Sequence, residues 1–402
     1  MRLGVLICED TWELSPSQLA RRAGAEAVLV INASPYESHK QREREQVIAQ
    51  RIAEVELPFV YSNLVGGQDE LVFDGNSFAM DAQGRLAMRA CAFHEALEVV
   101  ELTRAGPAGR VDVRAGRIKP ELSDEASVYS ALVLGVRDYV DKHRFPGVVM
   151  GLSGGVDSAL TLAIAADALG PERVHAVMMP SRYSSQMSRE DALEQARTLG
   201  VALSSISIEE IFDATLAALA EEFKGRPPDA TEENIQARCR GILLMGISNK
   251  TGRMLLTTGN KSEMAVGYAT LYGDMAGGFA PIKDCSKLLV YRLANYRNQL
   301  SRVIPQRVIE RAPTAELRHE QKDSDSLPPY EVLDPILEAF IEEDLSVEEI
   351  CELGFDRAVV ARVLDMVTRA EYKRRQAPPG VRVSRRAFGR DWRYPITNGY
   401  RR

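Results

Sequence analysis

A loop rich in glycine and serine lies between an apolar strand-like stretch and an apolar helix-like stretch in the middle of the chain. A strand that passes directly into a helix directs free backbone N–H groups and the positive end of the helix toward one point. Glycines let the backbone approach an anion closely, and serine hydroxyls add hydrogen-bond donors. We therefore predict a phosphate-binding loop, formed by Gly151, Leu152, Ser153, Gly154, Gly155, Val156, Asp157 and Ser158.

This loop differs from the common nucleotide-binding loops. It lacks the Gly-Lys-Ser/Thr ending of a Walker loop and the GxGxxG spacing of a dinucleotide fold. Transfer of the γ-phosphate of ATP is therefore not the expected reaction. The alternative interpretation is a Ser/Gly-rich helix N-terminus without a ligand, but the strand, the glycines and the helix stand in the order that a phosphate site requires.

The SGGxDS pattern of residues 153–158 resembles the pyrophosphate-binding loop of the N-type ATP pyrophosphatases, which adenylate a substrate and release pyrophosphate. The resemblance implies that ATP binds here, that the amides and hydroxyls hold its pyrophosphate, and that Asp157 binds Mg2+. Because this family includes NAD, GMP and asparagine synthetases, the loop alone does not identify the product.

Downstream segments narrow the choice. Residues 256–263 (LTTGNKSE) resemble the strand-to-helix signature of the NAD synthetases, which implies that Thr258 contacts ATP and that Glu263 binds Mg2+ or deamido-NAD. The same resemblance implies that Asn234 and Lys373 contact deamido-NAD. Taken singly, these could be solvated helix positions or part of a basic surface cluster. Further matching segments are residues 234–238, 273–275, 283–284, 311–317 and 371–375.

Together these segments predict an NAD synthetase. The resemblance implies that ATP adenylates the nicotinate carboxylate of deamido-NAD and that ammonia then displaces AMP, giving NAD, AMP and pyrophosphate. Two alternatives stay open. One is another adenylating amidotransferase of the GMP synthetase type, and the other is a catalytically inactive assembly subunit.

The first hundred residues carry a second resemblance. Residues 4–12 (GVLICEDTW) resemble the nucleophile strand of nitrilase-type amidase domains, which release ammonia from glutamine in glutamine-dependent NAD synthetases. This implies that Cys8 is the nucleophile and that Ser34 and Lys40 contact glutamine; residues 65–70 (VGGQDE) extend the match. A thiol attacks an amide only after a base removes its proton.

The amidase partners of the cysteine are the point where this chain departs from the family. The glutamate and lysine of the amidase triad lie upstream of the cysteine, and only seven residues precede Cys8. We therefore expect no useful glutaminase activity from this chain, whereas free ammonia should still support synthesis. We also expect apolar surface or an unpaired sheet edge in this half.

Strand-like and helix-like patterns alternate along the whole chain, which predicts an α/β fold. In the first half we expect strands at 2–8, 27–32 and 58–63, a helix that Ser15 caps and Gly24 ends, a helix at 40–55, and a turn at 81–84. The segment 103–120 is rich in Gly, Pro and basic residues without periodicity, which predicts a linker.

From residue 124 onward, repeated strand–helix units predict a doubly wound parallel sheet with ligands at the carboxyl ends of its strands. The expected helices are 124–143, 159–169, one capped by Ser188 and ended by Gly200, one ending near 223, and 231–247; the expected strands are 147–153, 174–179, 201–208 and 254–258. The tail from Gln376 is either a packed extension or an interface arm. The predicted domains are a partial nitrilase-like α/β sandwich (1–105), a linker (106–122) and an ATP pyrophosphatase domain (123–402).

Composition limits the partners. The net charge of −7 over 402 residues offers no overall attraction for nucleic acid or for an anionic membrane. No apolar run approaches the roughly 18 residues of a membrane span, and no secretory signal is evident, so a cytoplasmic setting is expected. The five cysteines lack CxxC spacing, which argues against disulfides or zinc. The family resemblance implies a homodimer or a larger homo-oligomer.

Overall fold

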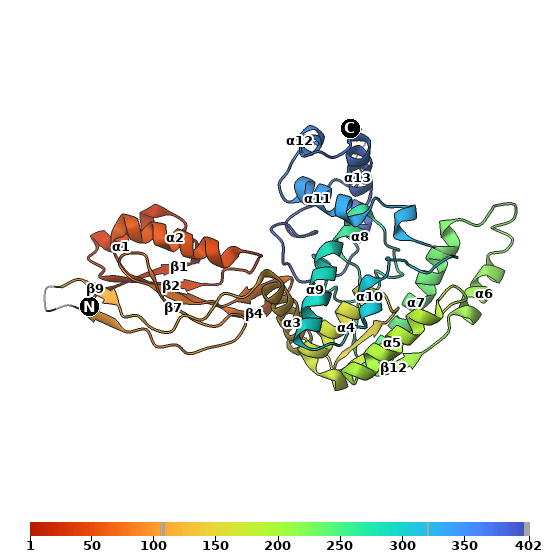
Figure 1. Cartoon of the computed structure of the whole chain (residues 1–402), viewed down its shortest axis with the longest axis horizontal. Coiled ribbons are helices and arrows are strands. Elements are labelled where there is room, and N and C mark those ends of the chain that lie inside the picture. Colours follow the sequence, from red (N-terminus) through yellow and green to blue (C-terminus); the bar gives the residue numbers. More distant parts are fainter. Residues whose placement is uncertain (105, 107–108, 320, 398–402) are drawn as a thin grey trace. The chain divides into compact units, whose positions relative to one another are not determined.

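The computed structural model describes residues 1–397 apart from residues 105, 107, 108 and 320 (Figure 1). The chain forms two compact units, Met1–Leu134 and Gly135–Arg402. The division falls inside helix α3 (Asp124–Lys142), which matches the helix predicted at 124–143. Each unit has its own sheet and its own core, and the domain boundaries that we predict at residues 105 and 123 stay predictions.

A five-stranded sheet in the order β1-β2-β3-β6-β7 organises the first unit. Strands β1, β2 and β3 are parallel, whereas β6 and β7 are antiparallel additions on one side. The elements are β1 (Leu3–Ile7), a 3-10 turn η1 (Cys8–Thr11), α1 (Leu14–Arg22), β2 (Ala27–Asn32), α2 (Lys40–Val55), β3 (Phe59–Asn63), the hairpin β4 (Val65–Gln68) and β5 (Leu71–Asp74), β6 (Phe78–Met80) and β7 (Leu86–Arg89). The predicted second strand and second helix have the observed bounds.

The two faces of this sheet differ. One face packs on the apolar side of α2, where Ile48 and Ile52 contact Val28 and Val30 in a dry core. On strand β1 the alternate residues Leu3, Val5 and Ile7 are 43%, 59% and 65% exposed. Among the described residues β1 is also an edge strand of its sheet. The structure therefore confirms the expected apolar surface and unpaired edge.

The segment predicted as a linker is not structureless. Strands β8 (Leu102–Arg104) and β9 (Val111–Val113) pair antiparallel, and Val113 packs against Ala79 and Met88 of the sheet. The sequence does not reveal these strands because a three-residue strand is too short to give a periodic signal, and the linker between two domains stays a prediction. Residues 107 and 108 of the predicted linker lie outside the described residues.

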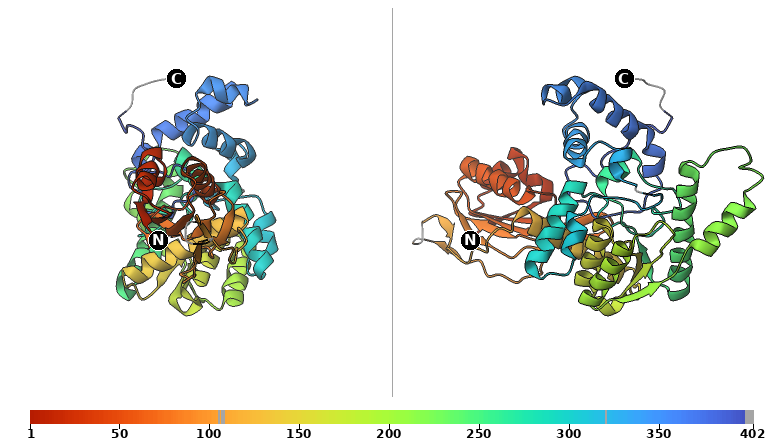
Figure 2. Two further views of the ribbon diagram at one scale, coloured as in Figure 1. Left: turned by 90° about the vertical axis from the view of Figure 1, so that its left-hand side faces the viewer. Right: turned by 45° about the vertical axis from the view of Figure 1, so that its right-hand side comes forward.

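The second unit contains the predicted parallel sheet, with four strands in the order β12-β11-β10-β13. Helix α4 lies almost fully buried against it, and the loop between α6 and α7 lies at the periphery of this unit (Figure 2). The elements are β10 (Val148–Gly151), α4 (Val156–Leu169), η2 (Pro171–Arg173), β11 (Val174–Met178), α5 (Gln186–Leu199), β12 (Ala202–Ser205), α6 (Glu209–Ala218), α7 (Ala230–Thr251) and β13 (Met254–Leu256).

Two predicted helix caps are wrong. Helix α5 is capped by Ser185, whose Oγ accepts from the Ser188 backbone N–H at 3.1 Å, so Ser188 lies inside the first turn. Helix α1 starts at Leu14 after Glu13, so Ser15 does not cap it. Several serines stand close together in the sequence before α5, and local chemistry does not choose between them.

Further helices follow β13 in this unit, and those between residues 330 and 374 are drawn in blue in Figure 1; several of these helices enclose a second core. The helices after β13 are α8 (Lys261–Val266), α9 (Lys287–Leu300), α10 (Gln306–Glu310), η3 (Asp323–Asp325), α11 (Tyr330–Ile341), α12 (Val347–Glu352), α13 (Arg357–Arg369) and α14 (Glu371–Arg374). The tail after them is a packed extension, because the Ala280 N–H donates to the Pro379 carbonyl at 2.8 Å. Its residues 398–402 lie outside the described residues. No described helix is both long and apolar enough to cross a membrane.

Candidate active site

The phosphate loop is a tight structure held by its own serines. Ser153 Oγ and Ser158 Oγ lie 3.1 Å apart, and Ser158 Oγ donates to the Gly155 carbonyl at 2.9 Å. Gly154 has φ +84°, and a Cβ there would lie 2.4 Å from the Ser188 carbonyl oxygen. Arg311 Nη2 donates to the Gly154 carbonyl at 2.6 Å. The loop is therefore fixed in place before any ligand arrives.

Two carboxylates and a lysine meet beside this loop. Lys287 Nζ lies 2.5 Å from Asp157 Oδ2 and 3.2 Å from Glu263 Oε1, although the three residues come from α4, α8 and α9. Asn260, the N-cap of α8, donates to the other Asp157 oxygen at 2.9 Å. Sequence reasoning missed Lys287, although the matching segment 283–284 ends three residues before it.

Because these three side chains are largely buried, the charge of each one shifts the pKa values of its neighbours. Desolvation raises the pKa of the Glu263 carboxyl to about 8, with Lys287 opposing the rise and Asp157 adding to it. Burial alone would lower the pKa of Lys287, but the charges of Asp157 and Glu263 raise it above its usual value. The ammonium thus offsets the repulsion that two close carboxylates would otherwise suffer.

The carboxylates fit a magnesium ion of the kind that accompanies nucleotides. Such ions are held by one or two carboxylates together with phosphate oxygens, not by a cage of protein ligands. Asp157 and Glu263 both contact the ammonium group of Lys287, so the two carboxylates lie close to each other. Among the described residues, no group of three or more His, Cys, Asp or Glu side chains could hold a metal ion. Asp157 and Glu263 would therefore fit a magnesium ion whose other ligands come from a bound nucleotide.

A third carboxylate, Asp323 on η3, lies near the pair. It accepts from the Tyr330 hydroxyl at 2.9 Å, and burial raises the pKa of the Asp323 carboxyl while Lys287 lowers it. This residue carries no local sequence signal, because it lies in an irregular segment more than 160 residues after the loop.

A cavity of 490 Å3 joins the loop to the rest of the predicted site. Of the residues that we predict for ATP and deamido-NAD, all except Gly154 line it, including Thr258, Asn234, Glu263 and Lys373. Gly154 faces Ser188 instead. A single cavity of this size, with polar groups at both ends, suits a nucleotide site.

Asn234 and Lys373 meet at the loop that follows α8. Asn234 Oδ1 accepts from Thr270 Oγ1 at 2.8 Å, and Lys373 Nζ donates to the carbonyls of Gly267 and Ala269 at 2.7 Å each. An ammonium has three donors, so Lys373 keeps one for a ligand. The two residues therefore meet at one segment of the cavity wall, and their contacts to deamido-NAD stay a prediction.

Helix α8, which carries Glu263, is anchored by a buried lysine. Lys261 Nζ lies 2.7 Å from Glu342 Oε1, 3.0 Å from Asp284 Oδ1, 2.6 Å from Ser384 Oγ and 2.9 Å from the Arg386 carbonyl. Its ammonium is therefore fully occupied by side chains and backbone of the C-terminal region. Lys261 fixes α8 but does not line the cavity.

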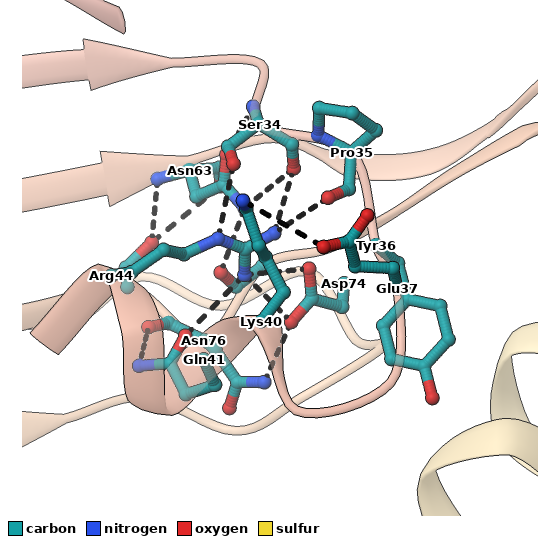
Figure 3. A network of polar contacts seen from close by, with 12 residues as sticks. Ser34, Pro35, Tyr36, Glu37, Lys40, Gln41, Arg44, Asn63, Asp74 and Asn76 are labelled. Atoms are coloured by element: carbon teal, nitrogen blue, oxygen red, sulfur yellow. Dashed lines mark hydrogen bonds and ion pairs between the residues drawn. The ribbon is translucent and has the colours of Figure 1, made fainter. Parts of the chain in front are cut away.

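The first unit holds a separate polar network around a buried arginine (Figure 3). Arg44 Nη1 donates to both oxygens of Asp74, at 2.8 and 2.9 Å, and Arg44 Nε donates to Ser34 Oγ at 3.1 Å. Lys40 Nζ lies 2.7 Å from Glu43 Oε2 and 3.7 Å from Glu37 Oε1. Arg44, which sequence reasoning missed, thus fixes the segment that carries the predicted glutamine contacts.

Cys8 lies at the carboxyl end of β1 with φ +45°, a backbone conformation that is uncommon outside glycine. Thr11 Oγ1 donates to its carbonyl at 2.9 Å. Because Ile7 pairs with Ile31, Cys8 lies at the same edge of the sheet as the segment of Ser34. All five cysteines are free thiols in this structure. The lack of glutaminase activity stays a prediction.

Comparisons with known proteins match each of the two units to a protein family. The family model for NAD synthase matches residues 128–377, and the family model for carbon-nitrogen hydrolase matches residues 1–107. The glutamine-dependent NAD(+) synthetase of Acinetobacter baylyi is 52% identical over 407 residues, which span 100% of this chain and 74% of that protein. The enzyme of the same name from Thermotoga maritima is 45% identical over 433 residues, spanning 100% of this chain and 75% of that protein.

Two solved structures are similar to this chain over different shares of its length. The structure of a glutamine-dependent NAD+ synthetase from Acinetobacter baumannii in complex with ADP superposes with a TM-score of 0.75 at 50% identity, covering 99% of this chain and 72% of that one. The structure of an NMN synthetase from Francisella tularensis has a TM-score of 0.54 at 26% identity, covering 63% of this chain and 96% of that one.

Proposed function

Since this chain belongs to the family of glutamine-dependent NAD(+) synthetases, we propose that it joins ammonia to the nicotinate carboxyl of deamido-NAD at the expense of ATP. The products are NAD, AMP and pyrophosphate. The observation that carries the proposal is the preformed loop 151–158 beside the Asp157–Lys287–Glu263 cluster, within one cavity that reaches Asn234 and Lys373.

The reaction has two chemical steps. A carboxylate is a poor electrophile because its oxygen is a bad leaving group, so attack of the carboxylate on the α-phosphate of ATP first forms an acyl-adenylate and releases pyrophosphate. Ammonia then attacks the acyl carbon, and AMP departs. Neither step needs a covalent nucleophile from the protein, so the main tasks of this site are to position two ligands and to offset phosphate charge.

Each task has residues that suit it. The backbone amides and serines of residues 151–158 bind the phosphates of ATP, and Thr258 contacts the same nucleotide. Asp157 and Glu263 would hold Mg2+, which would supply positive charge beside the phosphates. Lys287 orients both carboxylates.

The substrate contacts line the same cavity as the phosphate loop. Asn234 and Lys373 hold deamido-NAD against the loop that follows α8, and Glu263 also lines this cavity. In the first unit, Cys8, Ser34 and Lys40 lie at the positions that the family resemblance assigns to glutamine hydrolysis. The activity proposed for this chain uses free ammonia.

One assay separates this function from its two alternatives. Purified protein is incubated with ATP, Mg2+ and ammonium chloride, with either deamido-NAD or xanthosine monophosphate, and pyrophosphate and AMP are measured. We expect turnover with deamido-NAD only. Turnover with xanthosine monophosphate would favour an enzyme of the GMP synthetase type, absence of turnover with both would favour an assembly subunit, and ADP as product would contradict the adenylation step.

Two substitutions serve as controls for this assay. Asp157→Ala should abolish pyrophosphate release, whereas Cys8→Ala should leave the ammonia-dependent rate unchanged, because the thiol belongs to the other unit. We also propose that the protein is cytoplasmic and that it forms a homodimer or a larger homo-oligomer. Size-exclusion chromatography with light scattering tests the oligomeric state.

A further inference from the structure

One face of helix α7 forms a wall of the cavity and carries a positive charge that the proposed reaction leaves unused. The cavity-lining residues of this helix recur at helical spacing, which places them on one side of α7. They are Ala230, Glu233, Asn234, Ala237, Arg240, Gly241 and Leu244. Asn234 belongs to the proposed deamido-NAD end, whereas Arg240 lies almost two turns further along.

Arg240 is hydrogen-bonded to the segment that follows the strand next to the phosphate loop. Its Nε donates to the Met179 carbonyl at 3.1 Å, just after strand β11. Strand β11 is the neighbour of β10, which leads into the loop, and the Leu152 N–H donates to the Val177 carbonyl at 2.9 Å. Backbone hydrogen bonding therefore connects the arginine to the start of the phosphate loop through two adjacent strands.

The guanidinium has no bonded counter-ion among the described residues. Its nearest carboxylates, Glu209 and Glu316, act on it only through longer-range attraction. Glu209 is instead paired with Arg182 at 2.8 Å, and Glu316 accepts from the hydroxyls of Ser185 and Ser188 at 2.8 and 2.7 Å.

A buried guanidinium without an anionic partner is energetically unfavourable, and a bound anion would remove this cost. Burial lowers the pKa of the Arg240 guanidinium, which shows that its surroundings disfavour the charged form. Arginines inside proteins are normally paired with an anion, and the planar guanidinium matches the oxygens of a phosphate. The terminal nitrogens have no protein acceptor in the described part of the chain, so they remain available to the cavity.

We propose that Arg240 is a nucleotide-binding residue that donates to the phosphate chain of the adenine nucleotide from the cavity wall that α7 forms. The proposal rests on the proposed function for the identity of the nucleotide. It assigns α7 two contacts, with Asn234 for the dinucleotide substrate and Arg240 for ATP.

Isothermal titration of the whole chain with ADP tests the proposal without requiring turnover. Arg240→Gln should weaken ADP binding roughly 10- to 100-fold, because a charge-assisted hydrogen bond is lost. Arg240→Lys should fall between Arg240→Gln and the unsubstituted protein, since it keeps the charge but not the planar fork. Lys250→Gln, in the last turn of the same helix, is the matched control and should bind ADP within about twofold of the unsubstituted protein.

Steady-state kinetics provide the second readout. In Arg240→Gln the KM for ATP should rise while the KM for deamido-NAD stays within about twofold. Unchanged ADP affinity in a folded Arg240→Gln protein would overturn the proposal, and so would equal rises in both KM values. If Arg240→Gln fails to fold, Arg240→Lys decides, and undiminished ADP binding by that variant would equally overturn it. Absence of NAD formation by the unsubstituted protein would refute the proposed function but not the ADP result.

Discussion

Gly154 and Gly155 are neighbours in the phosphate loop, yet the structure predicts opposite responses to alanine. Gly154 has φ +84°, and an added Cβ would lie 2.4 Å from the carbonyl oxygen of Ser188 and 2.9 Å from its carbonyl carbon. Gly155 has φ −85° and ψ 160°, and its added Cβ would meet nothing closer than Ser153 Oγ at 3.4 Å. Only the first glycine is required by the fold itself.

The cost at Gly154 has two parts. A left-handed backbone costs an alanine about 1–2 kcal/mol, and relief of an overlap with fixed backbone costs about 1–3 kcal/mol more. Gly154→Ala should therefore lower the free energy of unfolding by about 2–5 kcal/mol. A shift of the loop instead would stretch the bond from Arg311 to the Gly154 carbonyl and move the amides that face the cavity.

Urea unfolding followed by circular dichroism, together with titration by ADP, measures both effects. We expect Gly154→Ala to be destabilised and to bind ADP at least tenfold more weakly. Gly155→Ala should be as stable as the unsubstituted protein, because alanine adopts that backbone without strain. Equal stability of the two variants, or full ADP binding by Gly154→Ala, would refute the reasoning.

Three further substitutions test other parts of the structure. Arg44→Met should lower the free energy of unfolding of the first unit by about 3–5 kcal/mol because Asp74 keeps its buried charge, and an unchanged urea midpoint would contradict this. Lys261→Met should reduce NAD formation and thermal stability together, with Lys261→Arg less affected; loss of neither would show that α8 needs no anchor. His175 has a pKa held below its usual 6.5, first by burial and then by the charge of Arg253, so its stability contribution is full above pH 6.5 and is lost as pH falls through the lowered value. In His175→Gln the free energy of unfolding should fall less between pH 7 and pH 5 than in the unsubstituted protein, and an equal fall would contradict the assignment.

Local chemistry predicts a large part of this fold. The charged amphipathic helix 40–55 and the apolar strand 27–32 have the predicted bounds because each carries a complete periodic signal between clear breakers. The phosphate loop is predictable for the same reason, since strand, glycines and helix are contiguous in sequence. Hairpin β8–β9 is missed because three residues cannot establish a period.

The polar centre of the site is much less predictable. Lys287 meets Asp157 across 130 residues, and Asp323 approaches both from an irregular segment. No local pattern marks a side chain whose role depends on which distant helix packs beside it. The requirement for glycine at 154 likewise comes from Ser188, on the next helix, and not from the loop sequence.

The anchoring of α8 has a consequence for the order in which this unit can fold. Lys261 depends on Ser384 and on the Arg386 carbonyl, which lie 123 and 125 residues later in the chain. Contacts of such sequence separation form late, because loop closure must precede them. During synthesis the sheet and the phosphate loop can assemble early, but Glu263 gains its final position only when the last segment docks. Adenylating competence should therefore arise in the closing step of folding, after most of the secondary structure is already in place.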